Sequence, residues 1–178
     1  MKIMAIRHLP TRFNIAGLLQ GKRDEPILQP SQEDYNVISE NRKKMDAFRP
    51  FDKMLVSSLR RTAMTADCYG YQEDITIEPL LDELNFGIYE GKHRKEMLDE
   101  IGEQWINDPL SLILGEPLTN LQKRVSRFLY KYHRSDRLLI FGHAAWLRAL
   151  KAYVRHGSIH EMNRFNINNN ELLMIDVE

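Results

Sequence analysis

Lys2-Ile3-Met4-Ala5-Ile6-Arg7-His8 opens the chain with a short apolar run that ends abruptly in a cation and an imidazole. Residues 2–6 predict a β-strand that begins almost at the first residue. In an open α/β sheet, ligands bind just beyond the carboxyl ends of the strands, which is where Arg7 and His8 would lie. A histidine beside a guanidinium that can bind phosphate is a candidate nucleophile with its charge partner attached. On their own, the same two residues could be polar surface residues that follow a strand.

Strand-like and helix-like segments alternate along the rest of the chain, with no repeat, low-complexity tract or linker between them. The alternation predicts one α/β domain over residues 1–178, in which helices cover both faces of a mostly parallel central sheet. Further strands are expected at residues 53–57, 75–77, 137–141 and 171–177. Helices are expected at residues 31–48, 59–69, 119–132 and 144–156. A capping box at Ser31 opens the first helix, Thr119 caps the third, and Gly157 closes the last.

The segment of residues 92–118 is weakly patterned and contains Pro109, Gly115 and Pro117. Proline and glycine interrupt helices, so we expect several short helices here. We interpret this segment as a flap over the site.

The composition is that of an ordinary globular protein, with 43% hydrophobic and 28% charged residues among 178. Its 25 Lys and Arg residues match its 25 Asp and Glu residues, and a net charge of zero disfavours a nucleic-acid-binding protein. The one cysteine, Cys68, excludes an intrachain disulfide. Because we find neither a signal peptide nor an apolar stretch of about 20 residues, we expect a cytoplasmic protein with no membrane contact.

Two later strands also end in polar residues. The strand at residues 53–57 leads to Ser57, with Arg60 and Arg61 in the first turn of the next helix, and another strand leads to His143. Helix N-termini favour phosphate because their N–H groups lack partners and carry partial positive charge. Arginines and two histidines that meet at one sheet edge therefore predict a pocket for a phosphoryl group.

Five blocks of sequence carry a family resemblance. The first is Arg7-His8-x-x-Thr11-x-x-Asn14, and the others lie at residues 19–26, 57–66, 81–91 and 141–150. In this order they resemble the histidine phosphatase superfamily, the phosphoglycerate-mutase-like proteins. The resemblance implies the three-layer α/β/α fold of that family and phosphoryl transfer without a cofactor or a metal ion.

The resemblance also implies roles for individual residues. His8 would attack phosphorus and form a phosphohistidine, while Arg7, Arg61 and His143 would hold the phosphoryl oxygens. Glu83 would protonate the leaving alcohol and then help to activate water, although Glu90 is a rival for this role. The residues expected to contribute to phosphate or substrate binding are Thr11, Asn14, Gln20, Gly21, Arg60 and Ala144.

The chain departs from the family pattern beside both histidines. Leu9 and Pro10 follow His8 where most relatives have a glycine, and Ala144-Ala145 replaces the common Gly-Gly. Alanine keeps its backbone N–H, so phosphate binding at Ala144 is still expected. We expect Leu9 and Pro10 to narrow the mouth of the pocket or to form an apolar wall against the substrate.

Three functions remain open at this point. Sixty residues separate Glu83 from His143, an interval that resembles the compact phosphatase branch, such as the α-ribazole phosphatases. A phosphoglycerate mutase carries a longer insertion, which protects phosphohistidine from water. We therefore expect a phosphomonoesterase that acts on a small phosphorylated metabolite. A mutase-type transfer enzyme and a non-catalytic phospholigand-binding protein are the alternatives.

Overall fold

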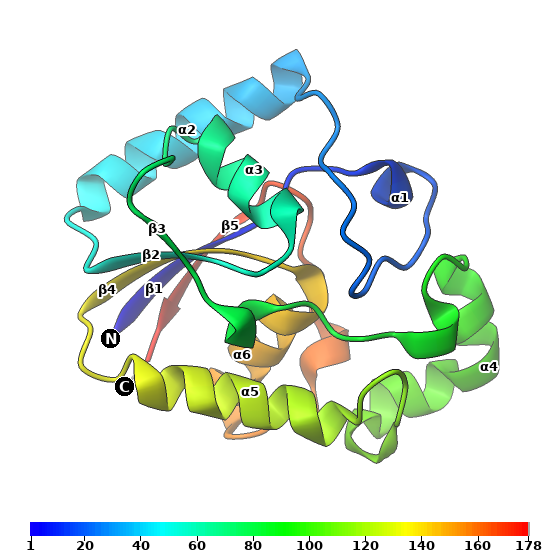
Figure 1. The fold of residues 1–178 in the computed structure, drawn as a ribbon. Helices are drawn as coiled ribbons and strands as arrows, with labels where there is room; N and C mark the ends of the chain where they lie inside the picture. Colours follow the sequence, from blue (N-terminus) through cyan, green and yellow to red (C-terminus); the bar gives the residue numbers. More distant parts are fainter. Residues whose placement is uncertain (178) are drawn as a thin grey trace.

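The computed structural model describes residues 1–177, which contain a five-stranded sheet of order β3-β2-β4-β1-β5 (Figure 1). The strands β1 to β4 pair in parallel, and β5 pairs with β1 in the antiparallel direction. This confirms the expected fold class. The bounds of the strands are β1 Lys2–Arg7, β2 Lys53–Val56, β3 Ile75–Ile77, β4 Arg137–Gly142 and β5 Leu172–Asp176. The single domain over residues 1–178 stays a prediction, and its last residue lies outside the described range.

Helices cover both faces of the sheet. On one face, Met4 and Ile6 pack against α2 (Gln32–Phe48) and α3 (Arg60–Cys68). On the other face, Ile3 and Ala5 pack towards α5 (Leu118–Lys131) and α6 (Ala144–His156). A strand that is buried on both faces needs apolar side chains at successive positions, which is why β1 reads as a continuous apolar run.

Several helix ends follow the expected chemistry. The Ser31 side chain accepts a hydrogen bond from the Asp34 N–H, and the Asp34 carboxylate accepts one in return from the Ser31 backbone, which completes the capping box. Gly157 ends α6 in the left-handed region with φ 70°, a conformation that glycine adopts without the steric cost of a Cβ.

The structure corrects three local expectations. Residues 92–118 contain one regular helix of 14 residues, α4 (Arg94–Asn107), rather than several short ones. Helix α5 begins at Leu118 after Pro117 and has no side-chain cap, so Thr119 is not the capping residue. A short helix, α1 (Arg12–Ile15), follows β1, where none of the expected helices lies. The described chain also has four 3-10 turns, η1 Pro79–Leu81, η2 Gly87–Tyr89, η3 Pro109–Ser111 and η4 Met162–Arg164.

Within residues 1–177, no helix combines the length and the apolar character that a membrane crossing requires.

Candidate active site

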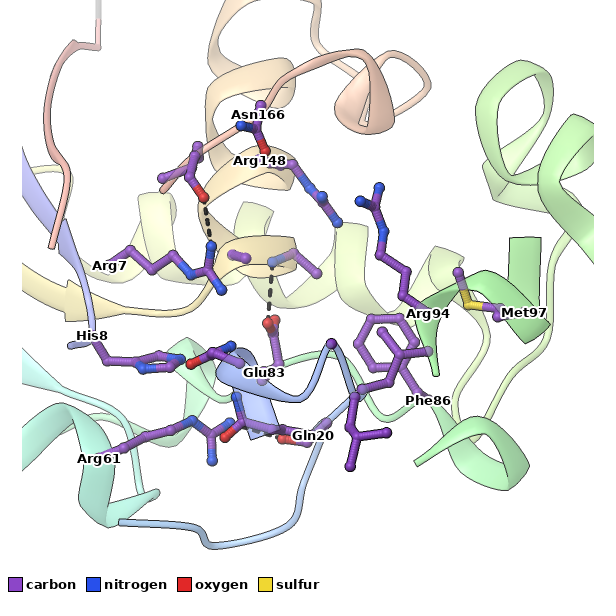
Figure 2. A pocket seen from close by; sticks show the side chains of 18 of the residues that line it. Arg7, His8, Gln20, Arg61, Glu83, Phe86, Arg94, Met97, Arg148 and Asn166 are labelled. Carbon is purple, nitrogen blue, oxygen red and sulfur yellow. Dashed lines mark hydrogen bonds between the residues drawn. The ribbon is translucent and has the colours of Figure 1, made fainter. Parts of the chain in front are cut away.

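The sheet register brings the two predicted histidines together. In the parallel β1–β4 pair, Arg7 lies opposite Gly142, so His8 and His143 follow at the same level. Their rings meet edge to face with centroids 5.3 Å apart, and both side chains are buried. The candidate site thus lies at the carboxyl ends of adjacent central strands (Figure 2).

The hydrogen bonds of His8 define its tautomer. Its Nδ1 lies 2.7 Å from the carbonyl oxygen of Leu9, which can only accept, so Nδ1 carries the ring proton. The lone pair is therefore on Nε2. Burial lowers the pKa of His8 well below its usual value of 6.5, and the nearby Arg61 and Arg7 lower it further. A neutral imidazole with a free Nε2 is what a histidine nucleophile requires.

His143 has the opposite tautomer. The Nε–H of Arg61 donates to its Nδ1 at 3.2 Å, so Nε2 carries the proton and donates to the Ser57 hydroxyl at 2.7 Å. Burial, with Arg61 next in importance, lowers the pKa of His143 well below 6.5. Both histidines are therefore neutral at pH 7.

We expect the stability of the unliganded protein to fall as the pH falls below about 6.5. The unfolded chain takes up protons on His8 and His143 near their usual pKa of 6.5, whereas the folded chain, with lowered pKa values, does not. The unfolded state binds more protons in this range, so the free energy of unfolding decreases by about 1.4 kcal/mol per pH unit for each histidine.

Urea denaturation in phosphate-free buffer at pH 7.5 and 5.5 measures this effect. The variant His8→Gln removes one of the two groups and should show a shallower pH dependence than the wild-type protein. Equal pH dependence in both proteins would contradict the assignment of a lowered pKa to His8.

Arg61 and Arg7 present guanidinium groups to the same cavity. The fully buried Arg61 also donates to the carbonyls of Arg23 at 2.7 Å and Gly21 at 2.9 Å. Arg7 donates to the carbonyl of Ile167 at 2.6 Å. Each guanidinium has five N–H donors, so both arginines retain donors for a ligand and are held in place by backbone contacts.

Glu83 lies at the N-terminus of α6 rather than free in the cavity. Its carboxylate accepts hydrogen bonds from the backbone N–H groups of Ala145 and Trp146 at 3.1 Å each, and from Leu84 at 3.0 Å. The helix N-terminus is therefore only partly open to phosphate, which corrects the expectation of a free set of donors. The N–H of Ala144 has no acceptor among residues 1–177, and Ala144 lines the cavity.

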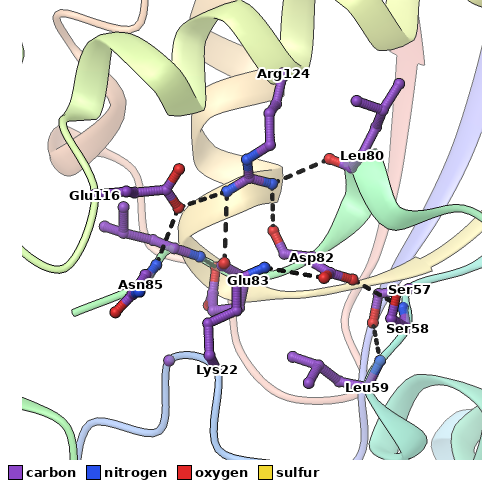
Figure 3. Close-up of polar contacts among 12 residues, drawn as sticks. Lys22, Ser57, Ser58, Leu59, Leu80, Asp82, Glu83, Asn85, Glu116 and Arg124 are labelled. Carbon is purple, nitrogen blue, oxygen red and sulfur yellow. Dashed lines mark hydrogen bonds and ion pairs between the residues drawn. The ribbon is translucent and has the colours of Figure 1, made fainter. Parts of the chain in front are cut away.

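Arg124 of α5 holds the loop that carries Glu83 (Figure 3). Its guanidinium donates to the carbonyls of Leu80 at 3.1 Å and Asp82 at 2.6 Å, and to the Glu116 carboxylate at 2.8 Å. Asp82 in turn accepts from the Ser58 N–H at 2.8 Å. These contacts tie the loop both to α5 and to the end of β2, so Glu83 has a fixed position.

Glu90 joins two loops and does not line the cavity. Its Oε1 accepts from the N–H of Lys22 at 2.9 Å and from the N–H of Phe86 at 3.1 Å. Gly21 has φ 54°, and a Cβ there would collide with the Glu90 carboxylate, so glycine is required at this position. Of the two candidate acids, only Glu83 borders the cavity.

The structure brings some of the predicted binding residues into the cavity and leaves others outside. Asn14, Gln20, Gly21 and Ala144 line the cavity. Thr11 does not, because it caps α1, and its N–H and hydroxyl donate to the Asn14 Oδ1 at 3.0 and 3.1 Å. This leaves the Asn14 Nδ2 available as a donor.

Arg60 also lies outside the cavity. It is exposed, its Nε donates to the carbonyl of Asp24 at 2.9 Å, and its own N–H donates to the Asp24 carboxylate at 2.8 Å. Arg60 thus anchors the loop that contains Asp24, and the expectation that it binds phosphate is not supported by its position.

The expectation for Leu9 and Pro10 is wrong, since neither residue lines the cavity. Leu9 is fully buried in the core beside Met4 and Ile6, and its N–H donates to the Thr65 hydroxyl at 3.0 Å. Leu9 is therefore a core residue and not part of the wall of the site.

Sequence reasoning missed part of the cavity, which has a volume of about 230 Å³. Arg148 follows Ala144 by one helical turn, and this spacing could have indicated that its side chain lies on the same face of α6. No comparable signal marks Arg94, because α4 was not expected as a regular helix. The remaining lining residues that were missed are Gly17, Leu18, Leu19, Phe86, Met97, Trp105, Ala145, Asn166 and Ile167.

No group of three His, Cys, Asp or Glu side chains that could hold a metal ion is found among residues 1–177. The charged groups of the cavity are instead suited to an anionic ligand. Neutral His8, arginines with unused donors and a facing carboxylate define a candidate site for phosphoryl transfer, and His143 lies behind His8 without lining the cavity.

Residues 3–178 match the histidine phosphatase superfamily (branch 1), and the chain belongs to this superfamily. It is similar to the adenosylcobalamin/alpha-ribazole phosphatase of Salmonella typhimurium, with 29% identity over 162 residues, or 85% of this chain and 78% of that protein. Phosphoserine phosphatase 1 of Hydrogenobacter thermophilus is 21% identical over 188 residues, covering 100% of this chain and 87% of that protein. The family and the enzyme class expected from the sequence are confirmed.

The solved structures agree with this assignment. The crystal structure of the alpha-ribazole phosphatase from Shigella flexneri matches with a TM-score of 0.79 at 26% identity, covering 100% of this chain and 91% of that chain.

Proposed function

We propose that this protein hydrolyses the phosphate monoester of a small metabolite through a phosphohistidine intermediate on His8. The observation that carries the proposal is the state of His8, a buried and neutral imidazole whose Nδ1 proton is held by Leu9. Its ring points into the cavity beside the guanidinium groups of Arg7 and Arg61 (Figure 2).

In the first step, a bond forms between His8 Nε2 and phosphorus while the ester P–O bond breaks. The leaving oxygen takes a proton from the protonated Glu83 carboxyl group, and the alcohol departs. In the second step, water attacks phosphorus, Glu83 takes up the proton of that water, and the P–Nε2 bond breaks. The sum of the two steps is ester plus water to alcohol plus inorganic phosphate.

Donors for the phosphoryl oxygens come from four residues. The free N–H groups of Arg7 and Arg61, the Asn14 amide and the N–H of Ala144 all border the cavity. Fixed donors of this kind stabilise the charge that develops in the transition state without having to reorganise. Both ring nitrogens of His143 have protein partners. We therefore propose that His143 orients the Arg61 side chain in the unliganded site.

The relatives support this proposal at the level of substrate size and chemistry. Those compared above are named as an adenosylcobalamin/alpha-ribazole phosphatase and a phosphoserine phosphatase, and neither name denotes a macromolecular substrate. The cavity volume of about 230 Å³ is suited to a small metabolite. We propose the same class of substrate here, a soluble phosphorylated metabolite, and no nucleic acid.

The direct test is hydrolysis of 4-nitrophenyl phosphate and of a panel of phosphorylated metabolites with a chelator present. We expect release of inorganic phosphate that the chelator does not reduce. Absence of turnover together with measurable binding of inorganic phosphate would support a phospholigand-binding protein instead. Incubation with 3-phosphoglycerate and 2,3-bisphosphoglycerate tests the mutase alternative, and isomer interconversion faster than phosphate release would contradict the proposal.

A further inference from the structure

Two arginines in the cavity have no part in the chemistry described above. Figure 2 shows Arg148 and Arg94 beyond Glu83 as seen from His8, with both guanidinium groups directed into the same part of the cavity. An ester whose phosphoryl group lies at His8 would place its leaving group in that direction, because the leaving oxygen must reach Glu83.

Arg148 is an arginine without an anionic partner. Its Nε is buried with no hydrogen-bond partner, and within residues 1–177 its guanidinium donates to no other group. The pKa of Arg148 is lowered to about 10, chiefly by burial and in smaller part by Arg94 and Arg7, while Glu83 acts in the opposite direction. A buried guanidinium without an anionic partner destabilises the unliganded protein, and an anionic ligand that pairs with it would offset this cost.

The side chain of Arg148 and the backbone of Arg94 have defined contacts in the unliganded protein. The Arg148 guanidinium lies over the ring of Trp105, with 6.0 Å between its Cζ and the ring centroid. The backbone N–H of Arg94 donates to the Gly17 carbonyl at 3.0 Å, so the first turn of α4 is joined to the loop after α1. The Arg94 side chain itself is exposed and lines the cavity.

The charges of the cavity do not balance with a phosphate alone. In residues 1–177, the ionisable side chains that line the cavity are four arginines, one glutamate and the neutral His8. A phosphate dianion compensates part of this positive surplus and lies near Arg7 and Arg61. The uncompensated charge then remains at the far end of the cavity, where Arg148 and Arg94 lie.

We propose that the preferred substrate carries a carboxylate on its leaving group, and that Arg148 and Arg94 bind this carboxylate. The inference rests on the proposed function, since it assumes that the phosphoryl group is bound at His8. Guanidinium groups bind carboxylates through paired, charge-assisted hydrogen bonds, which is the chemistry that these free donors offer. The protein is thus inferred to act on phosphorylated hydroxy acids or amino acids.

The test compares 3-phosphoglycerate with glycerol 3-phosphate, which has a hydroxymethyl group in place of the carboxylate. Each is measured as a competitive inhibitor of 4-nitrophenyl phosphate hydrolysis, so neither has to be a good substrate. We expect 3-phosphoglycerate to bind about 10- to 100-fold more tightly. The Arg148→Met variant should lose most of this preference and bind glycerol 3-phosphate within about threefold of wild type.

Three further variants separate specific binding from general effects. Arg94→Met changes an exposed residue that should not affect folding, and it should also reduce the preference. Arg155→Met removes the same charge from the exposed end of α6, outside the cavity, and should leave the preference unchanged. Arg148→Lys, which keeps the charge, should restore part of the preference if the wild-type residue binds the carboxylate.

Equal affinity of the wild-type protein for both ligands would overturn the inference. An equal loss of affinity for both ligands in Arg148→Met would also overturn it. If 4-nitrophenyl phosphate is not hydrolysed, the proposed function fails, and the two ligands are compared by calorimetry instead. A carboxylate preference that depends on Arg148 would then still support the second anion site.

Discussion

The His8→Gln variant should lose at least about a thousandfold in kcat/KM for 4-nitrophenyl phosphate, because no other side chain in the cavity can replace its nucleophilic nitrogen. Glutamine is close in size to histidine, so the core around β1 should remain packed. His133 is exposed and does not line the cavity, and His133→Gln is the matched control with expected wild-type activity.

The same variant tests the intermediate. Brief incubation of the wild-type protein with a labelled phosphate ester, followed by alkaline quenching, should leave label on the chain that acid removes. His8→Gln should show none. Activity within tenfold of wild type in His8→Gln, or label that survives acid and is lost in alkali, would contradict a phosphohistidine on His8.

The second large effect is expected from Glu83→Gln, and its size should depend on the leaving group. An alkyl phosphate needs a proton on its leaving oxygen, and loss of a general acid costs about 10²- to 10⁴-fold. 4-Nitrophenolate leaves without protonation, so hydrolysis of its ester should be slowed much less. The amide oxygen of glutamine can still accept from the N–H groups of Leu84 and Trp146, which both donate to Oε1 of Glu83, so only the contact of the Ala145 N–H with Oε2 is lost.

Glu90→Gln provides the comparison for this effect. Because Glu90 joins the loops at Lys22 and Phe86 outside the cavity, its replacement should affect alkyl and aryl phosphates to a similar degree. A loss from Glu90→Gln that is much larger for the alkyl ester, or equal losses for both esters from Glu83→Gln, would transfer the role of the acid to another group.

Much of the architecture is predictable because it depends on local patterns. The apolar runs of β1 and β4 and the polar residues that follow them place His8 and His143 at one sheet edge. Once these strands pair in parallel in the observed register, the two rings become neighbours. The strand at residues 53–57 brings Arg61 to the same edge, whereas Glu83 comes from a segment that only the family blocks assign to the site.

The prediction fails where a side chain's direction depends on tertiary packing. Arg60 and Arg61 are adjacent in sequence, and successive residues on a helix point about 100° apart. Which face of α3 is buried therefore determines that Arg61 lies in the cavity and that Arg60 contacts Asp24. Leu9 was misplaced for a similar reason, since the path of the chain beyond β1 turns it into the core.

The carbonyl group of Leu9 affects the lifetime of the proposed intermediate. It holds a proton on Nδ1 of His8, so a phosphoryl group on Nε2 would be attached to an imidazolium ring. Such a ring departs as neutral imidazole, which is a far better leaving group than the imidazolate anion. The contact that orients the nucleophile would therefore keep the P–N bond labile. Because this acceptor belongs to the backbone, no change of side chain at residue 9 removes it, and rapid transfer to water would be a property of the fold itself.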